Sequence, residues 1–171
     1  TFSFFQNGCY VFQTKYNSND FLQIWFTDGE TAPYRILSTT DYEYPVIREV
    51  TAVNNQVFFL LQSRNHDLLL CRAIGTSFQV ISEATASTIR SLTYFNGNFY
   101  FTGSNYIYGA ELFRTNGNLP GAVLVADINV GAASSGAKPV IAINDRLLFT
   151  GYNSSTHELW STKGTNTGIS I

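Results

Sequence analysis

The stretch SLTYFNGNFYFT, residues 91–102, carries a complete β-hairpin signal: two short apolar runs joined by Asn96-Gly97. Asn-Gly is the preferred centre of a type I′ turn, because both central residues of that turn have a positive φ. Such a turn predicts that the flanking runs, Ser91–Phe95 and Phe99–Thr102, pair as antiparallel strands. The same signal occurs on both sides of this hairpin in the chain of 171 residues.

The Asn-led turn occurs four times, each time between two apolar runs. Successive copies begin 47, 42 and 48 residues apart. Asn and Asp tolerate a positive φ better than other residues that have a Cβ, so they can replace Gly in such a turn. The four copies are Asn7-Gly8, Asn54-Asn55, Asn96-Gly97 and Asn144-Asp145.

A second landmark, an apolar pair followed after three further residues by glycine, keeps the same period. Its glycines are Gly29, Gly75, Gly117 and Gly164, which are 46, 42 and 47 residues apart. The residue before the glycine varies while the glycine does not, which indicates an obligatory left-handed position in a bulged hairpin turn. The second residue of the pair is Trp25, Cys71, Phe113 and Trp160 in turn, and we expect the aromatic ones to lie in a core between repeats.

Two landmarks that stay in phase four times predict an internal repeat. The repeats cover about 1–45, 46–88, 89–136 and 137–171, and together form a single domain, 1–171. Each repeat has four apolar runs that we expect to be strands. These strands are Phe2–Phe5, Tyr10–Thr14, Leu22–Thr27 and Tyr34–Leu37; Val50–Val53, Val57–Leu61, Leu68–Arg72 and Phe78–Ile81; Ser91–Phe95, Phe99–Thr102, Glu111–Thr115 and Val123–Val125; and Val140–Ile143, Leu147–Thr150, Glu158–Ser161 and Ile169–Ile171.

Several runs are apolar on both faces, among them Val57–Leu61 and Phe99–Phe101. A strand of this kind is covered on both sides, as in small sheets stacked face to face. The expected fold is therefore an all-β β-propeller of four four-stranded antiparallel blades, either a closed ring or a four-blade segment of a larger propeller. The alternative over Phe78–Phe95 is a helix, since no Gly or Pro interrupts it; its β-branched, Ser and Thr content disfavours that.

The segment Glu158-Leu159-Trp160-Ser161-Thr162-Lys163-Gly164-Thr165 resembles the ELWxxDGT repeat. The segment at 111–117 resembles a variant, and 24–29 retains the Trp and the Asp-Gly. The copy at 70–76 departs most, with Cys71 and Ile74 at the Trp and Asp positions. The resemblance implies a propeller-like array in an exported bacterial protein, hence an extracellular or cell-surface location. The family has no common catalytic residues, so the resemblance implies no reaction.

Composition excludes several function classes. The 10 basic and 12 acidic side chains give a net charge of −2, which argues against nucleic-acid binding. No apolar run is long enough for a transmembrane segment. Cys9 and Cys71 are expected as small apolar residues in strands, although an exported protein could pair them. Because the chain begins at Thr1, we expect a processed product or part of a longer protein.

The candidate chemistry is sparse. Glu111 and Glu158 occupy the same position in two repeats, and we expect each to bind backbone or solvent rather than to form an acid/base pair. Oxygen ligands at 127–129 and 41–43 lack the density of a calcium loop. His66 and His157 do not match in position, and no nucleophile motif is present. We therefore expect no catalytic residue, metal or cofactor, and no enzyme.

The best candidate site is the connection between the second and third strands of the third repeat. It contains Asn105, Tyr106 and Tyr108, a pair of aromatic residues beside an amide that suits stacking on a sugar or anchoring a protein. Two functions follow as expectations. One is an exported binding or adhesion module for a carbohydrate or protein partner. The other is a structural subunit that self-assembles or belongs to a larger surface assembly or parent chain.

Overall fold

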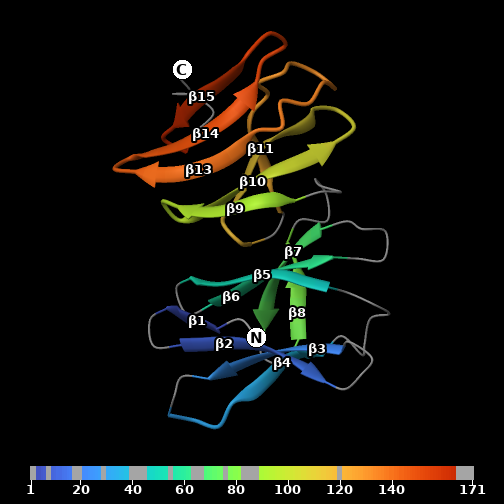
Figure 1. Ribbon diagram of the computed structural model, residues 1–171, viewed down its shortest axis with the longest axis vertical. Helices are drawn as coiled ribbons and strands as arrows, with labels where there is room; N and C mark the ends of the chain where they lie inside the picture. The colour runs from blue at the N-terminus through green and yellow to red at the C-terminus, as the bar shows by residue number, and fades with distance from the viewer. Residues whose placement is uncertain are drawn as a thin grey trace. The chain divides into compact units, whose positions relative to one another are not determined.

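A computed structural model describes residues 3–6, 9–16, 21–27, 30–38, 46–53, 56–62, 68–74, 77–81, 89–118 and 121–164. Over this part the chain is all-β and every strand pairing is antiparallel, which confirms the expected all-β class, while the propeller arrangement stays a prediction. The strands form four separate sheets, each made of strands consecutive in the chain (Figure 1). No membrane-spanning helix is found among these residues.

The chain divides into two compact units, Thr1–Val80 and Ile81–Ile171. The single four-repeat domain stays a prediction. The alternative helix over Phe78–Phe95 is wrong at both ends of that range, where the structure has the strands Ser77–Val80 and Arg90–Phe95.

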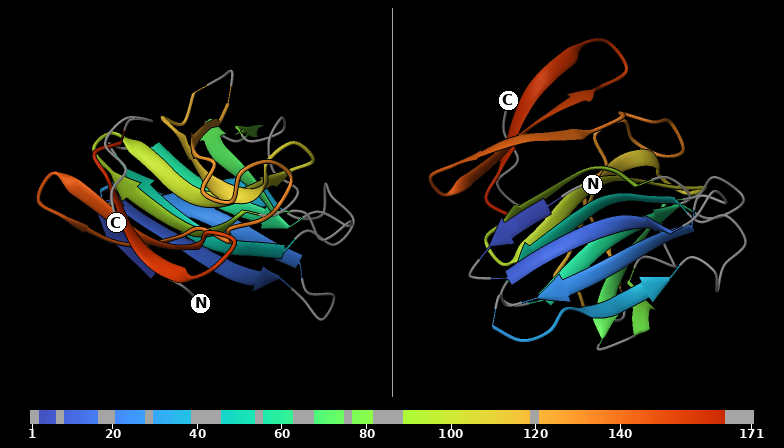
Figure 2. Two further views of the ribbon diagram at one scale, coloured as in Figure 1. Left: turned by 90° about the horizontal axis from the view of Figure 1, so that it is seen from above. Right: turned by 60° about the horizontal axis from the view of Figure 1, so that its bottom comes forward.

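The first unit contains two four-stranded sheets that meet face to face, as Figure 2 shows. Strand β5 of the second sheet lies against β1 and β2, and β8 lies against β4. Val57, Phe59 and Cys71 form part of its buried core. The strands are β1 (Ser3–Gln6), β2 (Cys9–Tyr16), β3 (Phe21–Thr27) and β4 (Tyr34–Ser38), followed by β5 (Val46–Val53), β6 (Gln56–Gln62), β7 (Leu68–Ile74) and β8 (Ser77–Val80).

The second unit contains a four-stranded sheet and a three-stranded sheet. The first is β9 (Arg90–Phe95), β10 (Asn98–Asn105), β11 (Gly109–Thr115) and β12 (Val123–Ala126). The second is β13 (Lys138–Ile143), β14 (Arg146–Tyr152) and β15 (His157–Thr162). The expected fourth strand, Ile169–Ile171, lies outside the described residues.

The two sheets of the second unit pack on a shared core. Tyr100 and Leu112 come from one sheet, and Leu147 and Phe149 come from the other. Trp160 is partly buried against this core. Burial on both faces of β10, where Phe99, Tyr100 and Phe101 are all buried, explains the continuous apolar run that the sequence shows there.

The Asn96-Gly97 turn has the backbone angles of a type I′ turn, because Asn96 and Gly97 have φ of 45° and 79°. In the Asn144-Asp145 turn only Asn144 has a positive φ, of 52°, so this turn is not of type I′. The turns at Asn7-Gly8 and Asn54-Asn55 lie outside the described residues. Gly117 and Gly164 have φ of 82° and 98°, in the left-handed region. Gly29 and Gly75 lie outside the described residues.

Candidate functional site

The β10–β11 hairpin carries the candidate residues at one end of the second unit. The Oδ1 atom of Asn105 accepts hydrogen bonds from the backbone N–H groups of Ile107 and Tyr108, both at 2.9 Å. This Asx-type turn fixes the hairpin tip. The side chain of Tyr106 is 90% exposed, whereas that of Tyr108 is partly buried. Asn105 therefore shapes the loop, and Tyr106 is the residue of the three that is presented to solvent.

The connection between β12 and β13, residues 127–137, lies against this hairpin. The N–H of Gly136 donates to the carbonyl oxygen of Ala110 at 2.9 Å, and the N–H of Ala110 donates to Ser134 Oγ at 2.9 Å. Gly109 has φ of 64°, and a Cβ there would stand 2.8 Å from the carbonyl oxygens of Ala132 and Ala133. Only glycine lets the connection approach the hairpin this closely.

A buried carboxylate holds the connection in place. Glu111, in the interior strand β11, is fully buried. Its carboxylate accepts hydrogen bonds from Ser135 Oγ at 2.6 Å and from the N–H of Ser135 at 2.8 Å. It also accepts from the N–H groups of Ile128 at 3.0 Å and Asn129 at 3.4 Å. The expectation that this glutamate binds backbone agrees with this geometry, although the strand is interior rather than at an edge.

Two opposing effects act on the pKa of Glu111. Burial raises the pKa above the ordinary value for a glutamate, because an apolar environment disfavours the charged form. The hydrogen bonds from Ser135, Ile128 and Asn129 lower it. The carboxylate is thus committed to structural hydrogen bonds.

The β14–β15 hairpin joins the same network. Ser154 Oγ donates to Asn129 Oδ1 at 2.7 Å, and the N–H of Tyr152 donates to the carbonyl oxygen of Ser135 at 3.0 Å. The β10–β11 hairpin, the 127–137 connection and the β14–β15 hairpin are therefore tied together. We call these three segments the loop platform.

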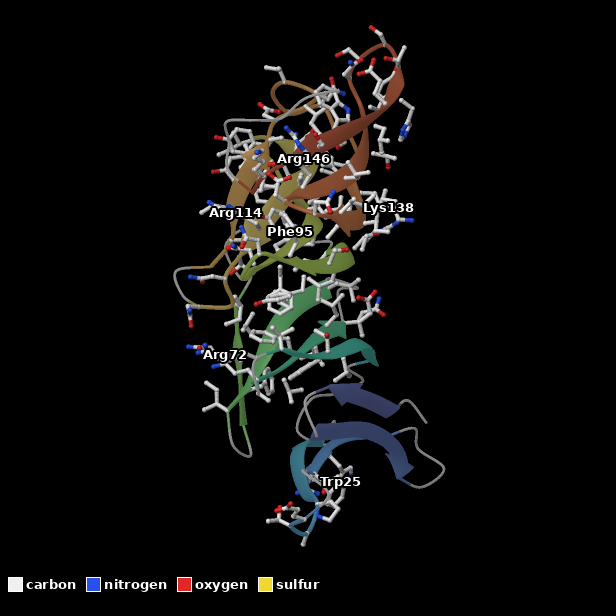
Figure 3. All side chains as sticks on the ribbon, turned by 90° about the vertical axis from the view of Figure 1, so that its left-hand side faces the viewer. Trp25, Arg72, Phe95, Arg114, Lys138 and Arg146 are labelled. Carbon is white, nitrogen blue, oxygen red and sulfur yellow. The ribbon has the colours of Figure 1, made fainter. Side chains whose placement is uncertain are left out.

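An open cleft of about 480 Å³ lies beside the platform, between the starts of β9 and β13. Among the described residues, its lining contains two cationic side chains, three hydroxyls and no carboxylate. Thr102 donates its hydroxyl to the carbonyl oxygen of Ala137 at 2.5 Å, which fixes one wall. Lys138 and Arg114 stand on opposite sides of the second unit in Figure 3, so Arg114 belongs to a different surface. The lining residues are Arg90, Ser91, Thr102, Ser104, Ala110, Gly136 and Lys138.

Ser91 in the cleft wall has φ of 58°, a conformation that costs free energy for a residue with a Cβ. It lies where the β9–β10 register shifts, between the pairs Thr93–Tyr100 and Arg90–Thr102. The bulge therefore turns the start of β9, with Arg90, toward the cleft.

This cleft is not among the sites predicted from the sequence, although the sequence contains a signal for it. Arg48, Arg90 and Lys138 each stand six residues before the turn Asn of their repeat, at Asn54, Asn96 and Asn144. The cations are in phase with the repeat. The cleft shows that two of them, from adjacent repeats, line one hollow.

The other candidates have local partners. Glu158 accepts hydrogen bonds from Asn153 Nδ2 at 2.9 Å and from Thr156 Oγ1 at 2.5 Å, within its own hairpin. Asp127 accepts from the N–H of Gly131 at 3.1 Å. Among the described residues, no group of three or more His, Cys, Asp or Glu side chains could hold a metal ion. The candidates at 41–43, and His66, lie outside the described residues.

The second residues of the apolar-pair landmark contribute to packing in the sheets. Phe113 is buried and stacks on Phe101, with ring centroids 6.4 Å apart. Trp25, labelled in Figure 3, is partly buried in β3 of the first unit. Cys71 is fully buried in β7, which agrees with the expectation of a small apolar residue in a strand.

No protein-family model matches this chain, and no curated protein matches it significantly.

Proposed function

We propose that the protein is a non-catalytic binding module that presents the loop platform to a carbohydrate or protein partner. The observation that carries this proposal is Tyr106, an almost fully exposed aromatic ring on a hairpin held by hydrogen bonds on both of its flanks. A rigid aromatic ring binds at little entropic cost. The hydroxyl-lined cleft beside it favours a carbohydrate over a protein partner.

The proposal also covers the arrangement of the sheets and the location of the protein. The in-phase landmarks and the resemblance to the ELWxxDGT repeat support a propeller-like arrangement of the four sheets, in an exported protein at the cell surface or outside the cell. Every carboxylate considered for acid/base chemistry in the second unit is engaged in structural hydrogen bonds, which supports a role without catalysis or a cofactor.

The substitution Tyr106→Ala tests the platform. We expect it to weaken binding to a retained oligosaccharide by about 2 kcal/mol, or roughly thirtyfold, because an exposed aromatic anchor loses its contact area. The free energy of unfolding changes by less than about 0.5 kcal/mol, since the ring supports no core. The measurement is an oligosaccharide array screen followed by calorimetric titration of the full chain.

Tyr94→Ala is the matched control. Tyr94 is also exposed, but it lies next to the Asn96-Gly97 turn, at the end of β9 away from the platform. Its loss leaves binding unchanged. Equal weakening by both substitutions, or no retained oligosaccharide, would count against the proposal.

A specific observation also favours the second function, self-assembly. One face of the β13–β15 sheet exposes Ile141, Ile143 and Leu159 at 50%, 47% and 52%. The positions of Ile143, Leu148 and Leu159 in the second and third repeats are filled by buried residues. Those residues are Val53, Phe58 and Leu70 in the second repeat and Phe95, Tyr100 and Leu112 in the third.

The occupant that fits this face is the first sheet of a second copy. On the opposite face of the β13–β15 sheet, Leu147, Phe149 and Trp160 pack on the core of the second unit. The first repeat carries Tyr10, Phe12 and Trp25 at these three positions. A head-to-tail contact of the two copies would then repeat the packing that already joins the sheets of the second unit.

Light scattering coupled to size exclusion tests this assembly. We expect the average mass to rise with protein concentration, and Leu159→Glu to return the protein to a monomer, because a carboxylate cannot be buried in an apolar contact without a partner. Val123→Glu, at an exposed position of β12, is the control and leaves association unchanged. A wild-type protein that stays monomeric at every concentration excludes the assembly.

A further inference from the structure

We infer that the cleft between the starts of β9 and β13 binds the anionic group of an acidic saccharide, a carboxylate or a sulfate carried on a sugar. The inference rests on the proposed carbohydrate-binding function and names its ligand class. The volume of about 480 Å³ lies within the range of small-ligand sites, about 300–1,000 Å³.

The positive charge of the residues that line the cleft favours an anionic ligand. Arg90 and Lys138 are the two charged side chains among the described residues that line the cleft, and both are exposed. Neither has an ion pair with another described residue. Two cations that lack an ion pair within the described part of the chain, placed on one cleft, favour a local positive potential although the net charge of the protein is −2.

The remaining polar groups select a sugar as the carrier of that anion. The hydroxyls of Ser91 and Ser104 line the cleft without a hydrogen-bond partner among the described residues, so they can exchange bonds with ring hydroxyls. Ser104 and Ala110 form the last pair but one of the β10–β11 hairpin, which places the cleft directly below the turn that carries Tyr106. A saccharide can therefore place its anion between the cations and extend toward the aromatic ring.

The strained backbone at Ser91 is a further sign of a binding site. A positive φ at a serine costs free energy, and the bulge that imposes it positions Arg90 on the cleft. A cation stands six residues before the turn Asn in three of the four repeats, at Arg48, Arg90 and Lys138, whereas the first repeat has Thr1 there. The cation is therefore a recurring feature of the second, third and fourth repeats.

The experiment is calorimetric titration of the full chain with four defined probes. Two are acidic saccharides, an oligogalacturonate and a sulfated heparin disaccharide. A neutral cello-oligosaccharide lacks the anion, and polyglutamate carries carboxylates without a sugar. We expect the acidic probes to bind, and their affinity to fall as the salt concentration rises. Arg90→Gln and Lys138→Gln should each weaken this binding about tenfold, because each removes a charge-assisted hydrogen bond.

Lys163→Gln is the matched control, since Lys163 is an exposed lysine outside the cleft that pairs with Asp145 at 2.7 Å. The control should leave binding unchanged, and all three variants should keep the wild-type melting temperature. The inference is overturned if acidic probes do not bind, if Lys163→Gln weakens binding as much as Lys138→Gln, or if polyglutamate binds as tightly as the acidic saccharides.

The test separates this inference from the proposed function. Binding of neutral saccharides that depends on Tyr106 and not on Arg90 or Lys138 would overturn the anion site and leave the binding module standing. Binding of acidic saccharides that depends on the two cations and not on Tyr106 would support the anion site and remove Tyr106 from the proposed function.

Discussion

Replacing Glu111 by alanine is expected to lower the free energy of unfolding by about 4 kcal/mol. The side chain is fully buried and accepts hydrogen bonds from three backbone N–H groups and one hydroxyl, on Ile128, Asn129 and Ser135. Each buried donor left without an acceptor costs about 1–3 kcal/mol, and water entering the space recovers part of this. Urea denaturation followed by tryptophan fluorescence measures the loss.

Glu158→Ala is the control for this substitution, because Glu158 holds the same position in the next repeat. Its partners, Asn153 and Thr156, lie in an open hairpin where water can replace the carboxylate. We expect a loss of about 1 kcal/mol. If the two substitutions destabilise the protein equally, Glu111 does not hold the 127–137 connection as described.

Gly109→Ala is expected to cost about 3 kcal/mol of stability and to disturb the loop platform. A positive φ costs an alanine about 1–2 kcal/mol. The added Cβ would also meet the carbonyl oxygens of Ala132 and Ala133 at 2.8 Å, so the backbone of the connection must move. Chemical denaturation gives the stability, and the affinity for a platform ligand gives the local effect.

Gly97→Ala separates the two causes. Gly97 has φ of 79°, but nothing lies within 4 Å of a Cβ at that position. It should therefore cost only about 1 kcal/mol, from backbone strain alone. If Gly109→Ala lowers the free energy of unfolding by no more than Gly97→Ala does, the 127–137 connection moves away from the added Cβ at no measurable cost in free energy.

The turns and strands could be predicted from the sequence because adjacent residues specify them. Asn96-Gly97 specifies its own turn, so the pairing of β9 with β10 follows from adjacent residues. The run at 99–101 is apolar on both faces of its strand, which predicts that both faces are buried. On the face that carries Tyr100, the core of the second unit provides this burial. The all-β class follows from these two features.

The candidate site was harder to predict from the sequence, because the residues that form it are far apart in the chain. Glu111 reaches donors 17 to 24 residues further along the chain, and no pattern at that distance marks an acceptor for backbone N–H groups. The expected exposure of Tyr106 is confirmed, whereas its role as a binding residue stays a prediction. The side-chain oxygen of Asn105 is engaged in the hydrogen bonds of the turn. The cleft depends on a bulge at Ser91, and a serine with positive φ has no sequence signature.

The pairing of each strand with its neighbours in the chain, over all described sheets, bears on how the protein folds. In the β10–β11 hairpin the most widely separated partners, Phe99 and Thr115, are only 16 residues apart. Short separations give a low contact order, and the loop-closure entropy that slows most all-β proteins is small. Each meander can thus nucleate independently and before synthesis of the chain is complete, so duplicating or deleting one meander would leave the hydrogen-bonded ladders of the others intact.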